Sequence, residues 1–427
     1  MSPSKDIRPV HGSIKIPGSK SLSHRVLIAA ALASGESTID NLLVCEDTVF
    51  TINALKELGT RISFEGESAR VFGTGARFPR NREKKEIFLG NSGTGYRLLL
   101  SVFALAQGEY LLTGSSRMNQ RPVGELITAL RNLGVQAVYQ GNEGFPPVLI
   151  RARGIPGGPV EITAKVSSQY VSSLLLSGPC MAKGLELTVL GGQVSRPYIR
   201  VTIEVMKEFG VEVERKSVSW YRIPRGQRYV PRNYSVEGDV SSASYFWAAA
   251  AVTGGTVTTE NIAPFTTLQG DIALLDILGE MGCTVVKEAN RVTIHGKPLR
   301  GVEVDMGGIP DMVPTLAAIA PFAEGRTVIT NVSHLRHKES DRLQAITTEW
   351  RRLGIRVDEL DDGIVIHGGE GHLRGAAVDP HNDHRIAMSL AVISLMAPGV
   401  IIRHKDCVNK SFPSFWQLWQ QLALKEI

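Results

Sequence analysis

The sequence predicts an α/β fold built from six similar units. Three observations carry this prediction: a phrase containing glycine recurs six times, a second glycine phrase recurs between its copies, and segments rich in helix-capping residues precede the first phrase. A period of tens of residues indicates one supersecondary unit repeated along the chain. The 427 residues are enough for two or three domains of ordinary size.

The first recurring phrase is an apolar helical pattern that ends near a glycine and continues into a β-rich segment, as in "AALASGESTID". Its glycines are spaced by 73, 76, 70, 71 and 74 residues along the chain. They are Gly35, Gly108, Gly184, Gly254, Gly325 and Gly399.

The second phrase is a helical pattern that ends in glycine and runs into a strand, as in "ALKELGTRISF". Glycine there fits the left-handed C-cap position, and the β-branched residues after it favour a strand. Its glycines are Gly59, Gly134, Gly210, Gly282 and Gly354. A sixth copy, "LWQQLALKEI", ends the chain, so each unit is predicted to hold two helices and several strands.

The segments before the first helix of each unit combine capping residues with cations. They read "GSKSLSHR", "GNSGTGYR", "KVSSQYVSS", "EGDVSSAS", "GIPDMVPT" and "PHNDHR". Capping alone accounts for the Ser, Asn and Asp residues. It does not account for Lys20, Arg25, Arg97 and Arg385, because cations at a helix N-terminus oppose the helix dipole unless an anion lies between them and the backbone. We therefore expect several of these helix starts to face a shared, anion-binding cleft.

Further cations occur in "SSRMNQRPVG", "HLRHKESDRL" and "CVNKSFP". Nine cations in motif-like settings outnumber the acids of the same motifs, Asp311, Glu339 and Asp383. The nine are Lys20, Arg25, Arg97, Arg121, Arg196, Lys338, Arg342, Arg385 and Lys410. Arginine forks suit phosphate and carboxylate, so the pattern predicts substrates that carry several such groups. "KESDRL" also fits an ordinary helix start with i,i+4 charge pairs.

Other functional classes lack their signatures. Aromatic content is 6% and no nucleic-acid-binding module occurs. The net charge of +5 is therefore not expected to serve nucleic-acid binding. The phosphate loop, the dinucleotide fingerprint and the serine-hydrolase elbow are missing. The histidine pairs His334/His337 and His381/His384 have zinc-ligand spacing, but adjacent Arg and Lys residues oppose a divalent ion, and we expect no metal.

The cysteines and the apolar runs favour a cytoplasmic protein. The four cysteines are far apart and form no CxxC pair, as expected of free thiols in a reducing compartment. The N-terminus lacks a signal-peptide pattern, and "IAMSLAVISLMAPGVII" is broken by serines and a Pro-Gly pair, which predicts a packed helix followed by a strand rather than a membrane span.

Over nearly its full length the chain resembles the 5-enolpyruvylshikimate-3-phosphate synthases, members of the enolpyruvyl transferase family. The resemblance lies in ten segments in family order: "PGSKSLSHR", "LGNSGTGYR", "RMNQRPVG", "VSSQYVSSLL", "SRPYI", "EGDVSSASYF", "IPDMVPT", "KESDRL", "NDHRIAMS" and "NKSFPSF".

The resemblance implies a two-domain, inside-out α/β barrel with six βαβαββ repeats, three in each domain. Residues 1–19 and 239–427 would form the first domain and residues 20–238 the second. The active site would lie in the cleft between them, and the two chain crossings would act as a hinge.

The implied reaction joins phosphoenolpyruvate to the 5-hydroxyl of shikimate 3-phosphate, with release of phosphate. The resemblance also assigns the binding residues. For shikimate 3-phosphate they are Ser21, Arg25, Ser167, Ser168, Ser195, Tyr198, Asp311, His334 and Lys338; for phosphoenolpyruvate they are Gly93, Arg121, Gln169, Arg342, Arg385 and Lys410. Lys20 contacts both, and Asn91 is a further substrate-binding residue. We expect no cofactor, and we expect a monomer.

The chemistry implied is addition and elimination through a tetrahedral ketal. Asp311 would take the proton of the attacking hydroxyl, and Glu339, Lys20 or His384 would protonate C3. A structural alternative makes Asp311 a helix N-cap. Because Arg25 lies at a helix start, we expect it to contribute to binding rather than to the core.

Two residues depart from the well-known bacterial form of the family: His334 replaces an asparagine, and Leu98, downstream of Gly93, replaces a proline that supports this helix. Gly93, whose lack of a side chain would leave room for phosphoenolpyruvate and for the inhibitor glyphosate, is present. The nearest rival is the sister enzyme that acts on UDP-N-acetylglucosamine, but its usual cysteine is missing from "TGSSRMNQRP". A phosphate-sensing relative without catalysis would lack Asp311 and Glu339.

Overall fold

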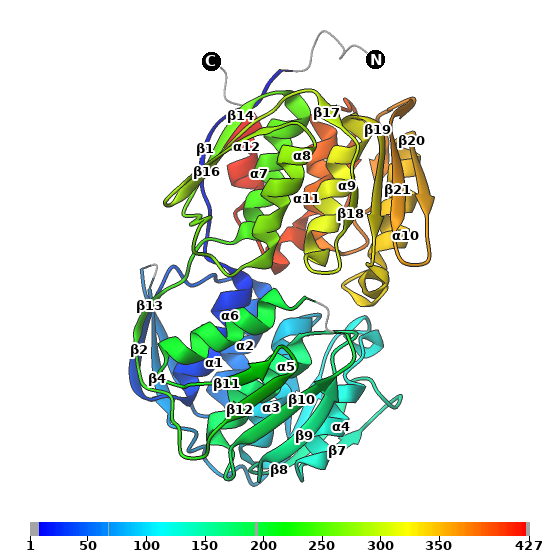
Figure 1. Cartoon of the computed structure of the whole chain (residues 1–427). Helices are drawn as coiled ribbons and strands as arrows, with labels where there is room; N and C mark the ends of the chain where they lie inside the picture. Colours follow the sequence, from blue (N-terminus) through cyan, green and yellow to red (C-terminus); the bar gives the residue numbers. More distant parts are fainter. Residues whose placement is uncertain (1–7, 67, 193–194, 424–427) are drawn as a thin grey trace. The chain divides into compact units, whose positions relative to one another are not determined.

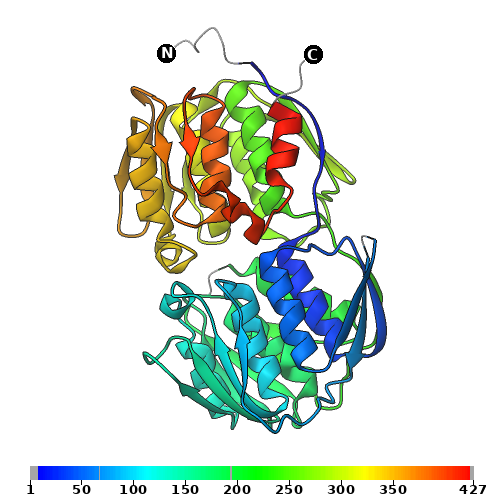
Figure 2. The same cartoon turned by 180° about the vertical axis from the view of Figure 1, so that it is seen from behind.

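The computed structural model describes residues 8–66, 68–192 and 195–423. The chain divides into two compact units (Figures 1 and 2). The first unit consists of the residues up to Pro17 and those from Glu237 onward, and the second unit runs from Gly18 to Val236. The chain passes from one unit to the other after Pro17 and again after Val236. A hydrogen bond from the Asp239 N–H to the Pro17 carbonyl (2.9 Å) connects these two places.

The second unit contains three helix pairs and three four-stranded sheets among its described residues. Its α-helices are α1 (Lys20–Leu32), α2 (Glu46–Glu57), α3 (Gly93–Ala104), α4 (Gly124–Asn132), α5 (Gln169–Ser177) and α6 (Pro197–Glu208). Its strands are β2 (Ser34–Asp40), β3 (Arg61–Glu65), β4 (Ser68–Thr74), β5 (Lys85–Phe88), β6 (Gln107–Thr113), β7 (Gln136–Tyr139), β8 (Val148–Arg153), β9 (Gly158–Thr163), β10 (Leu185–Leu190), β11 (Glu214–Ser217), β12 (Trp220–Ile223) and β13 (Asn233–Ser235).

The first unit repeats this arrangement with a shorter last sheet. Its α-helices are α7 (Val240–Thr253), α8 (Leu274–Glu280), α9 (Val313–Ile319), α10 (Arg342–Arg352), α11 (His384–Ser394) and α12 (Phe415–Ala423). Its strands are β1 (His11–Lys15), β14 (Thr256–Glu260), β15 (Thr284–Glu288), β16 (Arg291–His295), β17 (Leu299–Arg300), β18 (Glu303–Asp305), β19 (Ala323–Thr330), β20 (Ile355–Glu359), β21 (Ile364–Gly371), β22 (Ala377–Val378) and β23 (Ile401–Ile402).

Short 3-10 helices connect these elements. They are η1 (Met118–Gln120), η2 (Gly178–Cys180), η3 (Gly270–Ala273), η4 (Pro310–Met312), η5 (Ala320–Phe322), η6 (Ser333–His337) and η7 (Lys405–Lys410). Four of them, η3, η4, η6 and η7, lie in the first unit next to residues discussed below.

One pairing pattern recurs in the sheets. In the sheet β13-β2-β4-β3 the first pair is parallel and the next two pairs are antiparallel. The orders β5-β6-β8-β7, β9-β10-β12-β11 and β1-β14-β16-β15 follow the same rule. The last sheet, β22-β23, holds only the parallel pair. A parallel pair needs a crossover, which α3 supplies between β5 and β6, α5 between β9 and β10, and α11 between β22 and β23.

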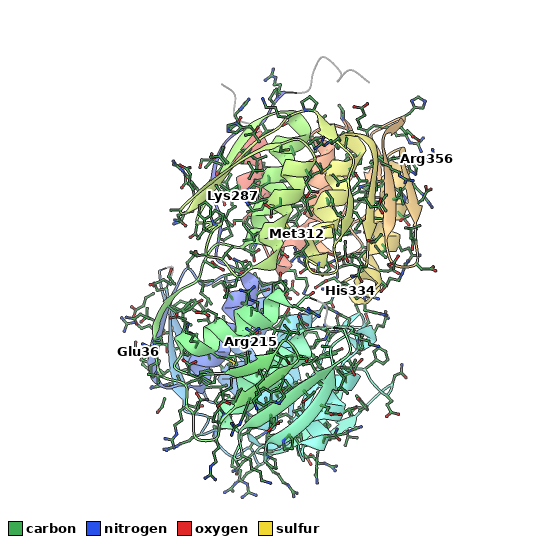
Figure 3. The ribbon with its side chains drawn as sticks, viewed as in Figure 1. Glu36, Arg215, Lys287, Met312, His334 and Arg356 are labelled. Carbon is green, nitrogen blue, oxygen red and sulfur yellow. The ribbon has the colours of Figure 1, made fainter. Side chains whose placement is uncertain are left out.

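Within each unit the helices lie inside and the sheets outside, as Figure 1 shows for α7, α9 and α11. Every residue of α7 is buried, and α7 packs on both α9 and α11. A helix that is apolar on all sides requires such an interior position. The sheets present charged side chains on their outer faces, such as Glu36, Lys287 and Arg356 (Figure 3).

The structure confirms the predicted glycine caps. The second-phrase glycines Gly59, Gly134, Gly210, Gly282 and Gly354 have φ values of 90, 89, 82, 117 and 80°. Residues with a Cβ rarely adopt such angles, so glycine ends these helices at little conformational cost. The run predicted to form a packed helix and a strand forms α11 and β23. Among the described residues, no helix is both long and apolar enough to cross a membrane.

Candidate active site

The predicted site residues fall into two groups, one in each unit, which we call the second-unit cluster and the first-unit cluster. The second-unit cluster comprises Lys20, Ser21, Arg25, Asn91, Gly93, Arg121, Ser167, Ser168, Gln169, Ser195 and Tyr198. The first-unit cluster comprises Asp311, His334, Lys338, Glu339, Arg342, His384, Arg385 and Lys410. Several of these residues lie at helix starts, because the six capping segments predicted from the sequence precede α1, α3, α5, α7, α9 and α11.

Capping side chains set the starts of α3 and α7. Ser92 accepts a hydrogen bond from the Gly95 N–H at the start of α3 (3.3 Å). Asp239 accepts from the Ser242 N–H at the start of α7 (2.9 Å). Each side chain satisfies a backbone N–H that the helix leaves unpaired, which is why the chain turns into a helix at these positions.

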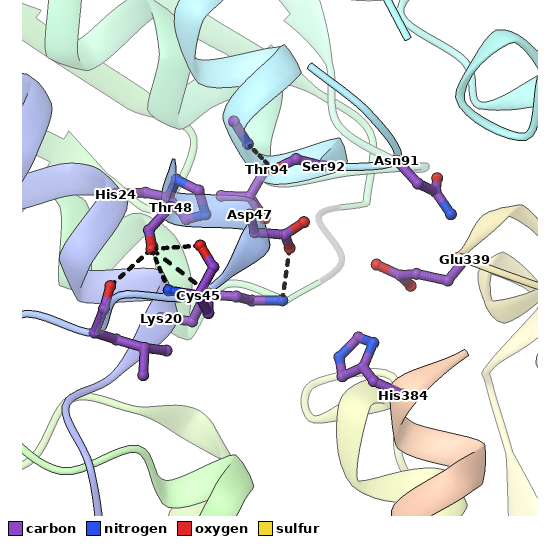
Figure 4. A network of polar contacts seen from close by, with 12 residues as sticks. Lys20, His24, Cys45, Asp47, Thr48, Asn91, Ser92, Thr94, Glu339 and His384 are labelled. Carbon is purple, nitrogen blue, oxygen red and sulfur yellow. Dashed lines mark hydrogen bonds and ion pairs between the residues drawn. The ribbon is translucent and has the colours of Figure 1, made fainter. Parts of the chain in front are cut away.

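Lys20, the first residue of α1, is held by a carboxylate. Its Nζ lies 3.2 Å from Asp47 Oδ2, and Asp47 is almost fully buried (Figure 4). Asp47 lies in the first turn of α2, which is held by the hydrogen bond from the Cys45 N–H to Thr48 Oγ1 (2.9 Å, Figure 4). Sequence reasoning missed Asp47, because an acid in the first turn of a helix is expected for the helix dipole alone.

Arg25 is buried inside the second unit. Its Nε donates to Thr202 Oγ1 on α6 (2.7 Å), and its Nη1 donates to the Ser21 carbonyl (2.7 Å). The guanidinium also lies over the Tyr198 ring, 5.9 Å from the centroid. Burial lowers the pKa of Arg25 to about 10, against the opposite effect of Tyr198. The expectation that Arg25 lies outside the core is wrong, because this buried arginine connects α1 with α6, and its contribution to binding stays a prediction.

Arg25→Ala is therefore expected to lower stability as well as turnover. It removes the four hydrogen bonds of a charged group and opens space between α1 and α6, so we expect the free energy of unfolding to fall by about 3–5 kcal/mol. Denaturant unfolding of parent and variant measures this. The control is Arg131→Ala, which loses a guanidinium that donates to the Ala137 carbonyl and stacks on Tyr139. Equal, small losses in both variants would contradict a core role for Arg25.

Arg121 closes over the start of α3. Its Nη1 donates to the Asn91 carbonyl (2.9 Å) and to Asn91 Oδ1 (3.2 Å). A Cβ atom placed on Gly93 would lie 2.3 Å from Arg121 Nη2, so a larger residue there would force this guanidinium to move. The structure thus brings Asn91, Gly93 and Arg121 together, as the sequence motifs suggested.

Gln169, the first residue of α5, forms hydrogen bonds through both the oxygen and the nitrogen of its side-chain amide. Arg97 Nη1 donates to Gln169 Oε1 (2.9 Å), and Gln169 Nε2 donates to Thr94 Oγ1 (2.9 Å). Arg97 also donates from Nη2 to the Pro122 carbonyl (3.0 Å). In this structure Arg97 therefore orients Gln169 and joins α3 to α5.

The serines of the second-unit cluster lie near the same helix starts. Ser167 Oγ accepts from the Gln169 N–H (3.2 Å), and Ser168 precedes α5. Ser195 has a φ of 52°, a left-handed value that is uncommon for a residue with a side chain. Tyr198 lies in the first turn of α6, and its carbonyl accepts from Thr202 Oγ1 (2.8 Å).

Asp311 is the centre of the first-unit cluster. Its Oδ1 accepts from Arg342 Nη1 (2.8 Å) and Lys338 Nζ (3.4 Å), and its Oδ2 accepts from Arg385 Nη2 (3.0 Å). Burial alone would raise the pKa of Asp311, but Arg385, Lys338 and Arg342 outweigh it and hold the pKa well below its usual value. The carboxylate hydrogen bonds of Asp311 come from these cations, so the N-cap interpretation is wrong.

Arg342 is fully buried and pairs with three carboxylates. Besides Asp311, Glu339 Oε2 accepts from its Nη2 (2.8 Å) and Asp383 Oδ2 accepts from its Nε (2.8 Å). Burial lowers the pKa of Arg342, but Asp383, Glu339 and Asp311 together raise it above its usual value. Asp383 also accepts from the Arg385 N–H at the start of α11 (3.0 Å). The sequence marked Asp383 as an acid of the motif without giving it this role.

The remaining residues of the first-unit cluster are three buried bases. Burial and the nearby Lys338 lower the pKa of His334 to about 4, so its ring is neutral at neutral pH. His384 Nδ1 lies 3.8 Å from Asp383 Oδ1, and Lys410 is buried at the end of η7. His337, three residues after His334, is exposed. In the part of the chain that the structure describes, no three His, Cys, Asp or Glu residues are grouped as metal ligands.

Comparisons with known proteins give one consistent result. A family model described as EPSP synthase (3-phosphoshikimate 1-carboxyvinyltransferase) matches residues 4–419. A 3-phosphoshikimate 1-carboxyvinyltransferase of Syntrophobacter fumaroxidans is 42% identical over 98% of this chain and 99% of its own length. One of Nostoc sp. is 40% identical over 96% of both chains. A solved structure of EPSP synthase from Acinetobacter baumannii has a TM-score of 0.78, is 29% identical, and covers 97% of this chain and 96% of its own.

Proposed function

This chain belongs to the EPSP synthase family, and we propose how its residues carry out the family reaction. It transfers the enolpyruvyl group of phosphoenolpyruvate to shikimate 3-phosphate in the pathway to the aromatic amino acids. The acceptor atom in our proposal is the oxygen of the 5-hydroxyl. Both substrates carry one phosphate and one carboxylate, which are the groups that arginine and lysine bind best.

The observation that carries the proposal is the sharing of the Asp311 carboxylate by Lys338, Arg342 and Arg385. In the protein without substrate, these cations hold Asp311 as an anion of low basicity. Anionic substrate groups beside Lys338 and Arg385 would offset that positive charge and raise the pKa of the carboxylate. Asp311 would thus become an effective base only when the substrates are bound.

In the addition step, the 5-oxygen of shikimate 3-phosphate attacks C2 of phosphoenolpyruvate while its proton moves to Asp311. C3 gains a proton from Glu339, Lys20 or His384, and a tetrahedral ketal forms. In the elimination step, C3 loses a proton and the C2–O bond to phosphate breaks, which releases inorganic phosphate. General acid–base help of this kind contributes about 100- to 10,000-fold, and fixed charges of the site contribute the rest.

Substrate contacts follow the two clusters. We assign shikimate 3-phosphate to Ser21, Ser167, Ser168, Ser195, Tyr198, His334 and Lys338, with Arg25 and Asp311. We assign phosphoenolpyruvate to Asn91, Gly93, Arg121, Gln169, Arg342, Arg385 and Lys410, and we assign Lys20 to both substrates. Because Arg25 and Arg342 already donate to protein groups, their main contribution would be to hold the neighbouring residues in place.

The decisive experiment is phosphate release by the purified protein. We expect release with phosphoenolpyruvate and shikimate 3-phosphate together, and none when UDP-N-acetylglucosamine replaces shikimate 3-phosphate. Mass spectrometry of the product should show shikimate 3-phosphate with an added carboxyvinyl group. Release with the UDP sugar instead would assign the chain to the sister reaction, and release with neither would refute the proposal.

We further propose that substrates draw the two units together, since cations of both clusters would contact the same ligands. Small-angle scattering is expected to show a smaller radius of gyration with shikimate 3-phosphate plus glyphosate than with no ligand. The control is shikimate without its phosphate. An unchanged radius at saturating ligand would contradict closure.

We propose a cytoplasmic monomer, and the four free thiols support a reducing compartment. Size-exclusion chromatography with light scattering should give a mass near 46.4 kDa.

A further inference from the structure

A buried carboxylate outside the predicted site lies behind Arg385. Asp271 belongs to η3 and is 1% exposed. Its Oδ2 accepts a short hydrogen bond from Ser241 Oγ in the first turn of α7. The helices α7 and α11 pack side by side in the first unit, which brings this pair next to the start of α11 (Figure 1).

Ser241 connects Asp271 to Arg385. Arg385 Nη2 donates to Ser241 Oγ (3.4 Å) and also to Asp311 Oδ2 (3.0 Å). A hydroxyl whose proton is directed to a carboxylate presents its lone pairs to a second donor. The guanidinium is therefore held between two carboxylates, directly by Asp311 and through a serine by Asp271.

The two supports differ in what happens to them during the reaction. Asp311 is the proposed base, so it loses its charge when it takes the proton of the attacking hydroxyl, and its hold on Arg385 weakens. Asp271 is separated from the reacting atoms by Ser241 and Arg385. Its contact with Arg385 therefore persists through that step.

We propose that Asp271 is a positioning residue for phosphoenolpyruvate: through Ser241 it keeps Arg385 oriented, including when Asp311 is protonated. This inference rests on the proposed contact between Arg385 and phosphoenolpyruvate. The proposed connection runs from the Asp271 carboxylate (η3) through the Ser241 hydroxyl (α7) to the Arg385 guanidinium (α11), which would contact the substrate.

The environment of Asp271 separates this role from a structural one. Burial, followed by the nearby Asp311, raises the pKa of Asp271 to about 6, against the effect of Arg385 and Ser241, and Asp239 adds a further small increase. A carboxyl group whose pKa is raised on folding stabilises the fold below its unfolded pKa, and this contribution is lost as the pH rises through the folded pKa. At pH 8 the ionised side chain therefore costs stability, and Asp271→Asn should melt higher than the parent.

The test measures KM for each substrate, kcat and melting temperature in a small set of variants. We expect Ser241→Ala to raise KM for phosphoenolpyruvate about three- to tenfold, and Asp271→Asn to raise it less, since asparagine remains an acceptor. KM for shikimate 3-phosphate should stay within about twofold. KM for phosphoenolpyruvate in the double variant should equal that of Ser241→Ala alone, because both changes break the same hydrogen-bonded connection between Asp271 and Arg385.

Two further variants make the result decisive. Ser389→Ala changes a buried serine one turn further along α11 and should leave both KM values unchanged. In an Arg385→Ala background, Ser241→Ala should have no additional effect. If Arg385→Ala itself leaves KM for phosphoenolpyruvate unchanged, the proposed site assignment is wrong.

If Arg385→Ala raises this KM but Ser241→Ala and Asp271→Asn do not, the positioning inference alone is overturned. Equal rises of both KM values, or additive effects in the double variant, would also overturn it. A lower melting temperature of Asp271→Asn at pH 8 with unchanged KM values would assign the carboxylate to the fold. A higher melting temperature together with a raised KM for phosphoenolpyruvate is the expected result.

Discussion

Replacement of Asp311 by asparagine is expected to lower kcat by at least about 100-fold, because asparagine cannot accept the proton of the attacking hydroxyl. Asparagine keeps the shape of the side chain and one acceptor oxygen, so Arg342 and Lys338 can still donate to it. KM for both substrates should therefore change much less than kcat. Steady-state kinetics with each substrate varied in turn measures this split.

The structure also gives Asp311→Asn an effect on stability that the sequence did not predict. Because the pKa of Asp311 is held below its usual value by three cations, the ionised side chain stabilises the fold above its unfolded pKa, and this contribution is lost as the pH falls through the folded pKa. The variant loses it, and we expect a decrease of about 3 kcal/mol in the free energy of unfolding at pH 8.

Asp305→Asn is the matched control for Asp311→Asn. Asp305 is an exposed aspartate of β18 whose carboxylate accepts from Asn331 Nδ2 (3.1 Å). We expect unchanged kcat and a change in stability within about 0.5 kcal/mol. An Asp311→Asn enzyme with parental kcat would transfer the role of base to Glu339 or His384.

Arg342→Met is expected to have the largest effect on stability. The side chains have similar length, but the change leaves Glu339 and Asp383 buried without the cation that each contacts at 2.8 Å. Removal of one partner from a buried ionic network costs about 3–5 kcal/mol, and here one arginine serves three carboxylates. Unpaired buried carboxylates also bind protons more readily, so the loss should be smaller at pH 5 than at pH 8.

Denaturant unfolding at both pH values measures this effect, with Arg336→Met as the control. Arg336 also contacts two carboxylates, Asp341 at 3.3 Å and Glu359 at 2.6 Å, but its side chain is 28% exposed. Its replacement should cost about 1 kcal/mol or less. A similar loss in both variants, or a loss in Arg342→Met that does not depend on pH, would contradict the account of the buried network.

The order of the elements could be predicted from the sequence because local rules govern it. Glycine after a helical pattern predicted helix ends at Gly59, Gly134 and the later copies, and the φ values confirm these. Capping residues predicted where α1, α3 and α11 begin. The ten family segments identified the reaction. All of these signals lie within a few residues of the feature that they predict.

The partners and the burial of the charged side chains were decided only by the tertiary structure. Lys20 and Asp47 are 27 residues apart, Arg342 and Asp383 are 41 apart, and Ser241 and Arg385 are 144 apart. Arg25 and Arg385 look alike in the sequence, since each lies near a helix start. Arg25 connects α1 with α6, whereas Arg385 contacts the Asp311 carboxylate directly and the Asp271 carboxylate through Ser241.

The sequence by itself therefore determined the fold class, the helix starts and the family, because glycine geometry, capping and motif spacing act along the chain. The tertiary structure decided which cations are compensated, which carboxylate is held ionised and which one, Asp271, lies behind the site. The physical reason is that burial and the electrostatic potential at a side chain depend on every element packed around it, and those elements are brought together only by folding.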